Sequence, residues 1–158
     1  MTMARDHRLC EQRWFEDFRL GERFPLPSRT MTDALFAAFQ LASGDNHPSH
    51  YDVEYCRAHG GSDLLGHGFQ GVEQNPAGAR PFPHINQDSM KGFIEPSSRF
   101  LKPVYAGDTL YCMLEVTELV PGKTTGVVAL SSTVRNQRGE VVMEGVQKYL
   151  LKKRPVQA

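Results

Sequence analysis

The segment LYCMLEV (residues 110–116) decides the fold class, because every second side chain in it is apolar. Successive side chains of a strand point to opposite faces, so this alternation predicts a half-buried strand. The same period recurs in residues 128–134, and residues 141–151 continue as a third long strand. Turn residues separate the three at Pro121-Gly122 and at NQRG (136–139). The segment SSRFLKPVYAGDTL (97–110) predicts one strand before them, so we expect an antiparallel meander of about four strands.

The N-terminal half has the helical period instead. Thr32 is suited to cap a helix, and Leu35, Phe36 and Phe39 follow at the three- and four-residue spacing of a buried face. This predicts an amphipathic helix that ends near Ser43-Gly44. We expect two further short helices. One is VEYCRAH (53–59), with Asp52 as its cap and Gly60-Gly61 at its end, and the other spans residues 69–75.

These predictions together define an α+β protein, which we interpret as one domain over residues 1–158. Residues 1–14 form a lead-in segment, and the aromatic side chains that follow, Phe15 and Phe18, should dock on the domain. Pro25 and Pro27 lie in an extended stretch, and proline favours the edge of a sheet because it cannot donate to a central ladder.

Composition excludes several partners. Lys plus Arg and Asp plus Glu both total 18, so we expect neither nucleic acid nor a membrane as a partner. No apolar stretch resembles a signal peptide or a membrane span, which favours a cytoplasmic protein. Cys10, Cys56 and Cys112 are widely spaced and predict buried or inert thiols rather than disulfides.

The stretch SGDNHPSHYD (43–52) concentrates the polar chemistry. Asp45 and His50 lie on an expected loop braced by Pro48, and a carboxylate and a neutral imidazole can share a water as acid and base. A plain polar turn explains the same residues. A metal site is a third interpretation, because His47, His59 and His67 lie near in sequence, but no HExxH or HxxEH pattern is present.

The motif GHGF (66–69) is the second informative piece. If His67 and Gly68 lead into a helix, the first amide groups point outward and could stabilise an oxyanion, while the alternative is a glycine-rich hinge. Asp108, in AGDTL (106–110), is interpreted as a turn residue. The absence of GxGxxG, P-loop and GxSxG motifs leaves nucleotide-binding and serine-hydrolase functions without support.

In this order and spacing, SGDNHPSHYD, GHGF, FLKPVYAGDTL (100–110) and NQRGEVV (136–142) resemble the MaoC-like dehydratases, the (R)-specific enoyl-CoA hydratases of the hot-dog fold. The resemblance implies that Asp45 and His50 are the catalytic pair and that Gly68, with His67 beside it, binds the thioester oxygen. His47 stands where the family has asparagine, which marks it as a modulator of the site.

The resemblance also implies a curved antiparallel sheet wrapped around a central helix, which Pro76 should shorten. The implied reaction is hydration of a 2-enoyl-CoA to a 3-hydroxyacyl-CoA, without a metal or cofactor beyond the CoA thioester itself. A homodimer or a dimer of dimers is expected. A hot-dog thioesterase, a non-catalytic acyl-CoA binding module and a metal-dependent hydrolase are the alternatives.

Overall fold

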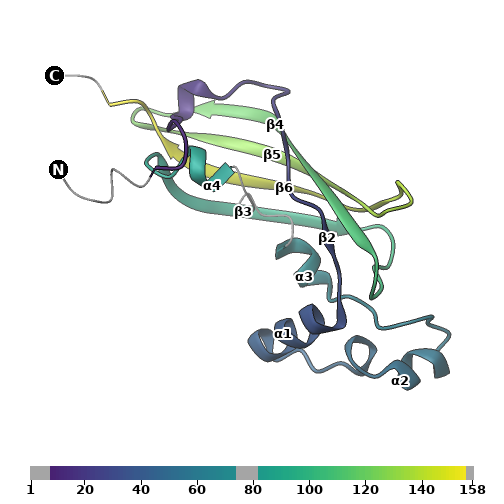
Figure 1. Ribbon diagram of the computed structural model, residues 1–158. Helices are drawn as coiled ribbons and strands as arrows, with labels where there is room; N and C mark the ends of the chain where they lie inside the picture. The colour runs from purple at the N-terminus through teal and green to yellow at the C-terminus, as the bar shows by residue number, and fades with distance from the viewer. Residues whose placement is uncertain (1–7, 74–81, 156–158) are drawn as a thin grey trace.

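One antiparallel sheet dominates the computed structural model, which describes residues 8–73 and 82–155 (Figure 1). The strand order is β1-β4-β5-β6-β3, and the short strand β2 also pairs with β4. The strands are β1 Arg23–Pro25, β2 Arg29–Thr30, β3 Met90–Phe100, β4 Thr109–Pro121, β5 Thr125–Arg135 and β6 Val141–Lys152. The helices are η2 Phe15–Asp17, α1 Asp33–Ser43, η3 Pro48–His50, α2 Val53–Ala58, α3 Gly68–Glu73 and α4 Phe82–Ile85.

The meander β4-β5-β6 confirms the prediction from alternating side chains. On β4 the predicted inward set is buried, and Leu114 and Val116 are 0 % and 1 % exposed. The predicted turn before β6 also forms, because Asn136 N–H donates to Glu140 C=O over 3.0 Å and Gly139 supplies a φ of 77°.

The first long strand differs from the expected meander. β3 begins at Met90, well before Ser97, and pairs with β6 rather than with β4, its successor in sequence. Most of its side chains are exposed, and Pro96 interrupts its pattern, so the strand has no clear alternation. β3 is the last strand of the sheet order, where an edge tolerates proline because one side of the strand needs no ladder partner.

The N-terminal stretch docks as predicted. Phe15 and Phe18 are 7 % and 3 % exposed, and Phe18 packs against Phe24 of β1 and Phe82 of α4 with ring centroids 6.3 and 5.7 Å apart. β1 and β2 both pair with β4 at the other edge of the sheet, which confirms the edge prediction from the prolines.

The predicted helix α1 is confirmed in its bounds. Thr32 Oγ1 accepts a hydrogen bond from Leu35 N–H at its start, and Gly44 ends it with a φ of 74°. Burial is weaker than expected, because Phe36 is the one buried residue of α1. Figure 1 explains this, since α1 and α2 lie beyond one end of the sheet, where the strands do not cover them.

The central helix begins at Gly68, one residue before the predicted start, and its predicted end at Asn75 lies outside the described residues, as does Pro76. α2 ends at Ala58, with His59 as its C-cap, one residue before the predicted end. Phe82 of α4 is 0 % exposed and packs on Tyr149 of β6, so the core lies between the helical side and the sheet. No helix in residues 8–73 or 82–155 has the length and apolar character needed to span a membrane.

Candidate active site

The loop after α1 carries Asp45 and fixes its backbone. Ser43 Oγ accepts a hydrogen bond from Asp45 N–H over 3.2 Å, and Asp45 Oδ1 accepts one from His47 N–H over 3.3 Å. The Asp45 side chain is 46 % exposed. The loop then forms the 3-10 turn η3, with Pro48 in its first position and His50 in its last. Proline fixes φ near the helical value, so Pro48 braces the turn that presents His50.

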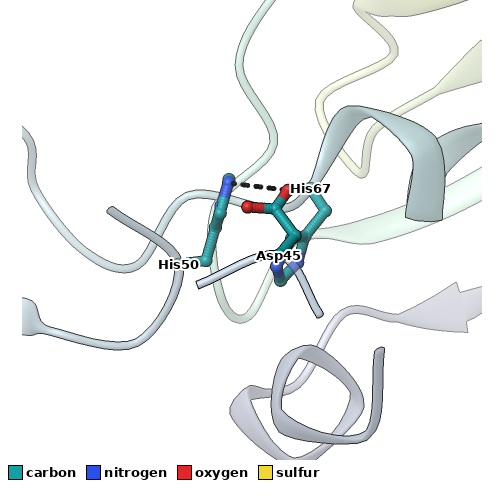
Figure 2. A group of neighbouring side chains, drawn as sticks. All are labelled: Asp45, His50 and His67. Carbon is teal, nitrogen blue, oxygen red and sulfur yellow. Dashed lines mark ion pairs between the residues drawn. The ribbon is translucent and has the colours of Figure 1, made fainter. Parts of the chain in front are cut away.

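The imidazole of His50 has a defined tautomer. Its Nδ1 lies 2.6 Å from the carbonyl oxygen of Leu65, and a carbonyl oxygen can only accept, so Nδ1 carries the proton. Nε2 of the neutral ring is then a free acceptor. It lies 3.9 Å from Asp45 Oδ2, beyond a direct hydrogen bond (Figure 2). One water oxygen about 2.8 Å from each atom could donate one hydrogen to Nε2 and the other to the carboxylate.

His67 forms the inner wall of this site. Its ring stacks on that of His50, with centroids 3.8 Å apart and planes 24° apart, and the residue is 3 % exposed. Burial is the main cause that lowers the pKa of His67. Phe36 and Phe39 of α1 flank the ring, and neither ring nitrogen has a well-formed hydrogen bond to the described residues. His67 is therefore a neutral, largely apolar support for His50.

The geometry disfavours one metal ion shared by these residues. Ligand atoms of Asp45, His50 and His67 lie within 4.8 Å of one another. An imidazole binds a metal in the plane of its ring, and two nearly parallel, stacked rings cannot aim their lone pairs at one ion about 2.0–2.1 Å from each nitrogen. His59 turns to its own helix, where its Nδ1 lies 2.8 Å from Tyr55 O. The arrangement favours acid/base chemistry over the metal interpretation.

His47 acts on the loop rather than on the reacting atoms. Its Nδ1 accepts a weak hydrogen bond from Ser49 N–H over 3.4 Å and lies 2.9 Å from Ser49 Oγ, so it caps η3. An asparagine side-chain oxygen commonly makes this type of cap. The His47 ring is 6.1 Å from that of His50, and the residue is exposed. His47 therefore makes the kind of cap that an asparagine could also make at this position.

A cavity of about 410 Å³ opens beside His50. Its inner wall is apolar, with Met31, Leu110, Val134, Val142 and Met143. His67, Gly68 and Gly71 contribute the wall from the start of α3. A Cβ on Gly68 would lie 3.2 Å from the ring of Phe100, so glycine keeps this wall open.

Gly68 and His67 thus lie where the sequence predicted them, at a helix start facing a pocket. Within the described residues, no hydrogen-bond acceptor takes the amide N–H of Gly68, as is usual for the first positions of a helix. The sequence did not reveal the carbonyl of Leu65, which selects the tautomer of His50. Every residue has a backbone carbonyl, so the sequence cannot show which one accepts a hydrogen bond. The nearest recognisable feature is Gly66, the first residue of GHGF, which follows Leu65.

These features define the class of protein. A curved antiparallel sheet, a polar Asp/His loop and a glycine-led helix beside an apolar cavity are the parts expected of a hot-dog protein of the MaoC-like type. Residues 17–137 match the family described as MaoC like domain, and the chain belongs to that family. This confirms the family and the fold that the motifs predicted.

Individual relatives agree with this assignment. The chain is 30 % identical over 138 residues to an (R)-specific enoyl-CoA hydratase from Rhodospirillum rubrum, covering 84 % of this chain and 87 % of that protein. Among solved structures, the monoamine oxidase regulatory protein from Archaeoglobus fulgidus superimposes with a TM-score of 0.85 at 28 % identity, over 92 % of this chain and 98 % of that one. A MaoC-like dehydratase from Rhodospirillum rubrum gives 0.73 at 27 % identity, over 90 % and 99 %.

Proposed function

We propose that the protein is a hydro-lyase that reversibly adds water to a 2-enoyl-CoA and forms an (R)-3-hydroxyacyl-CoA. The observation that carries the proposal is the pair of acceptors, His50 Nε2 and Asp45 Oδ2, 3.9 Å apart beside an apolar cavity. The hydratase named among the relatives supports the same reaction class. Asp45 and His50 are the proposed catalytic residues.

In the proposed reaction, Asp45 and His50 hold one water between them, and one of the two removes a proton as the water oxygen bonds to C3. The π electrons of C2=C3 move toward the thioester carbonyl and form an enolate. The proton then passes to C2. One C–O bond and one C–H bond form, while the C2=C3 π bond and one O–H bond of water are lost.

Gly68 is the proposed oxyanion donor. The enolate places negative charge on the thioester oxygen, and an amide N–H aimed at that oxygen stabilises the charge as it develops. Gly68 supplies such an N–H at the cavity wall, and the missing Cβ lets the thioester approach. His67, stacked on His50, binds the same end of the substrate. We propose no metal or cofactor beyond the CoA thioester.

The decisive experiment follows crotonyl-CoA with two readouts, loss of the enoyl absorbance and release of free thiol. Hydration removes the absorbance without thiol release. Asp45→Asn and His50→Ala should each lower kcat by roughly 100-fold or more, as expected for loss of an acid/base group. Asp52→Asn is the matched control, because Asp52 lies in the same loop but caps α2 through Tyr55 N–H, and asparagine caps equally well.

Other outcomes identify the alternatives. Thiol release would indicate a thioesterase instead of a hydratase. Tight binding of acyl-CoA without turnover, unaffected by Asp45→Asn, would indicate a non-catalytic binding module. Inhibition by a chelator together with stoichiometric zinc would indicate a metal-dependent hydrolase.

We infer further that the protein is a homodimer or a dimer of dimers. No described strand pairs with the outer edge of β3, where Phe93 and Ile94 are 50 % and 51 % exposed. Exposed apolar edges of this kind favour association. A Mycobacterium tuberculosis protein with a double hot-dog fold, matched at 24 % identity over 46 % of its length, shows two such folds in one chain. Light scattering would test the dimer, and the expected cytoplasmic location stays a prediction.

A further inference from the structure

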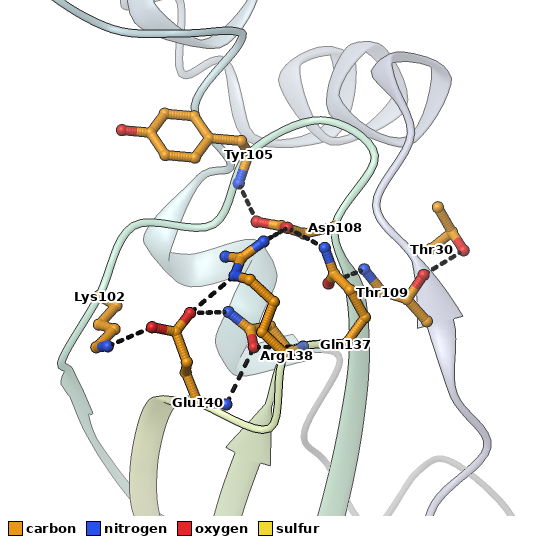
Figure 3. Close-up of polar contacts among 9 residues, drawn as sticks. Thr30, Lys102, Tyr105, Asp108, Thr109, Gln137, Arg138 and Glu140 are labelled. Atoms are coloured by element: carbon orange, nitrogen blue, oxygen red, sulfur yellow. Dashed lines mark hydrogen bonds and ion pairs between the residues drawn. The ribbon is translucent and has the colours of Figure 1, made fainter.

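Asp108 is a buried carboxylate that the proposed reaction does not use. The residue is 6 % exposed and lies in the turn just before β4, after residues 100–104, which line the cavity. Its Oδ2 accepts a hydrogen bond from Tyr105 N–H over 3.0 Å, and its Oδ1 accepts from Gln137 over 2.7 Å and Arg138 over 3.2 Å (Figure 3). Burial would raise the pKa of Asp108, but these three donors outweigh it and lower the pKa. Both oxygens of an ionised group are therefore in use.

The turn held by Asp108 continues into a backbone ladder. Tyr105 pairs with Leu65 in an isolated antiparallel bridge. Hydrogen bonds flank this bridge on both sides, since Gly66 N–H donates to Val104 C=O over 2.7 Å and Ala106 N–H donates to Leu64 C=O over 2.9 Å. The segment before α3 therefore takes its position from the turn that ends at Asp108.

Leu65 connects this segment to the loop that carries His50. Its N–H donates to Ser49 C=O over 2.8 Å, and its C=O accepts from His50 Nδ1 over 2.6 Å. Both polar groups of the Leu65 backbone therefore contact η3. A shift of Leu65 would move the acceptor that keeps the proton on Nδ1 and leaves Nε2 free.

We propose that Asp108 is a positioning residue for the reaction: it fixes the turn at Tyr105, and through Leu65 it holds His50 in the tautomer with Nε2 as the free acceptor. The kinetic consequence rests on the proposed hydratase function. The structural consequence does not, because the tautomer of His50 exists with or without substrate.

Asp108→Asn is the test variant. An amide replaces one of the two acceptor oxygens with an NH₂ donor, so at least one of Tyr105 N–H, Gln137 and Arg138 then faces another donor. The variant keeps the size of the side chain. It therefore changes the hydrogen bonding of the turn and leaves the packing volume almost unchanged.

Asp17→Asn is a control matched in its hydrogen-bond partners, at a side chain that is 31 % exposed against 7 % for Asp108. Asp17 accepts a hydrogen bond from the N–H of Trp14, three residues earlier, over 2.8 Å, and pairs with Arg154 over 2.7 Å, which repeats the chemistry of Asp108 with Tyr105 and Arg138. It lies far from the site. Phe15 beside it contacts Gly126 at the start of β5, whereas the partners of Asp108 follow the end of β5.

The first readout is the tautomer of His50, measured from its ring ¹⁵N chemical shifts, with His50→Ala used to assign the signals. We expect a protonated Nδ1 and a bare Nε2 in the wild type and in Asp17→Asn, and a mixture of both tautomers in Asp108→Asn. The second readout is kinetics on crotonyl-CoA. We expect kcat to fall about 10- to 100-fold in Asp108→Asn with KM changed less than about threefold, because small misplacements of a reacting group cost this much.

The outcomes separate the possible explanations. If Asp108→Asn and Asp17→Asn lower the melting temperature alike and both keep the wild-type tautomer and kcat, Asp108 is a structural residue and the proposal fails. If the wild type shows no hydration but the tautomer shifts in Asp108→Asn, the proposed function fails and the positioning role stands. Should Asp108→Asn not fold, Arg138→Met is the second variant. It removes one exposed donor to Asp108, and we expect a smaller change in the tautomer of His50 in the same direction.

Discussion

Gly126 and Phe15 provide a sharp test of how the N-terminal segment docks on the sheet. Gly126 lies in β5, and a Cβ built on it would be 2.6 Å from Cγ of Phe15 and closer still to two other atoms of that ring. Phe15 is 7 % exposed, so its ring has little free space to retreat into. Gly126→Ala should therefore force the ring out of its site.

The size of the effect has an upper bound. The protein can always relieve the clash by giving up the packing of Phe15, so Gly126→Ala should cost no more than Phe15→Ala. Removing a buried phenylalanine side chain costs about 3–5 kcal/mol. Since Phe15 lies in the short turn η2, just after the lead-in segment, we expect the lower end of this range, about 3 kcal/mol for Phe15→Ala and about 2–3 kcal/mol for Gly126→Ala. Both lie within a typical total stability of roughly 5–15 kcal/mol.

In the double variant, Gly126→Ala should have the opposite effect on the free energy of unfolding. Without the Phe15 ring the three atoms nearest to the methyl group at position 126 are gone, and alanine in a strand is favoured over glycine by about 0.5–1 kcal/mol. Gly126→Ala should then be neutral or stabilising in the Phe15→Ala background, when the free energy of unfolding is measured by urea denaturation. An equal cost of Gly126→Ala in both backgrounds would refute the packing of Phe15 on β5.

Three further predictions follow from single groups. Hydrogen bonds, first of all from Asn136, lower the pKa of Glu140 to about 2. Glu140 therefore stabilises the fold above about pH 4.5 and loses this contribution as the pH falls toward 2. In Glu140→Gln, the free energy of unfolding should change less with pH over this range. Burial raises the pKa of the Cys112 thiol to about 12, so it should react with a thiol reagent at pH 8 only after denaturation. At position 47, His47→Asn should keep the cap on Ser49 and the activity, whereas His47→Ala should lose about 1 kcal/mol of stability and part of kcat.

The sheet was predictable to the extent that burial alternates along its strands. Buried residues alternate with largely exposed ones on β4 and with half-buried ones on β5, so both sequences carry the period of two. β3 was harder to predict, because most of its residues are exposed and its partner β6 lies about fifty residues later in the chain. Pairing over such a separation depends on the whole sheet and has no local signature.

The exposure of α1 has a related cause. Leu35, Phe39 and Leu41 give this helix apolar surface that the described part of the chain only partly covers, and Leu41 is 88 % exposed. The sequence correctly predicted an apolar face. It could not predict what lies against that face, because hydrophobic periodicity records that a side chain avoids water and not which surface protects it.

The active site shows the same division between chemistry and geometry. Asp45 and His50 could be chosen from the sequence because their side chains carry the reacting groups. The state of His50 depends on the Leu65 carbonyl, fifteen positions along the chain, and Leu65 depends on its pairing with Tyr105, forty positions further. Both are backbone interactions, which almost any residue type can make. Proline cannot replace Leu65, because proline would remove the N–H that binds Ser49. The proposed reactivity of the site thus rests in part on backbone hydrogen bonds, and the type of side chain at these positions does not reveal them.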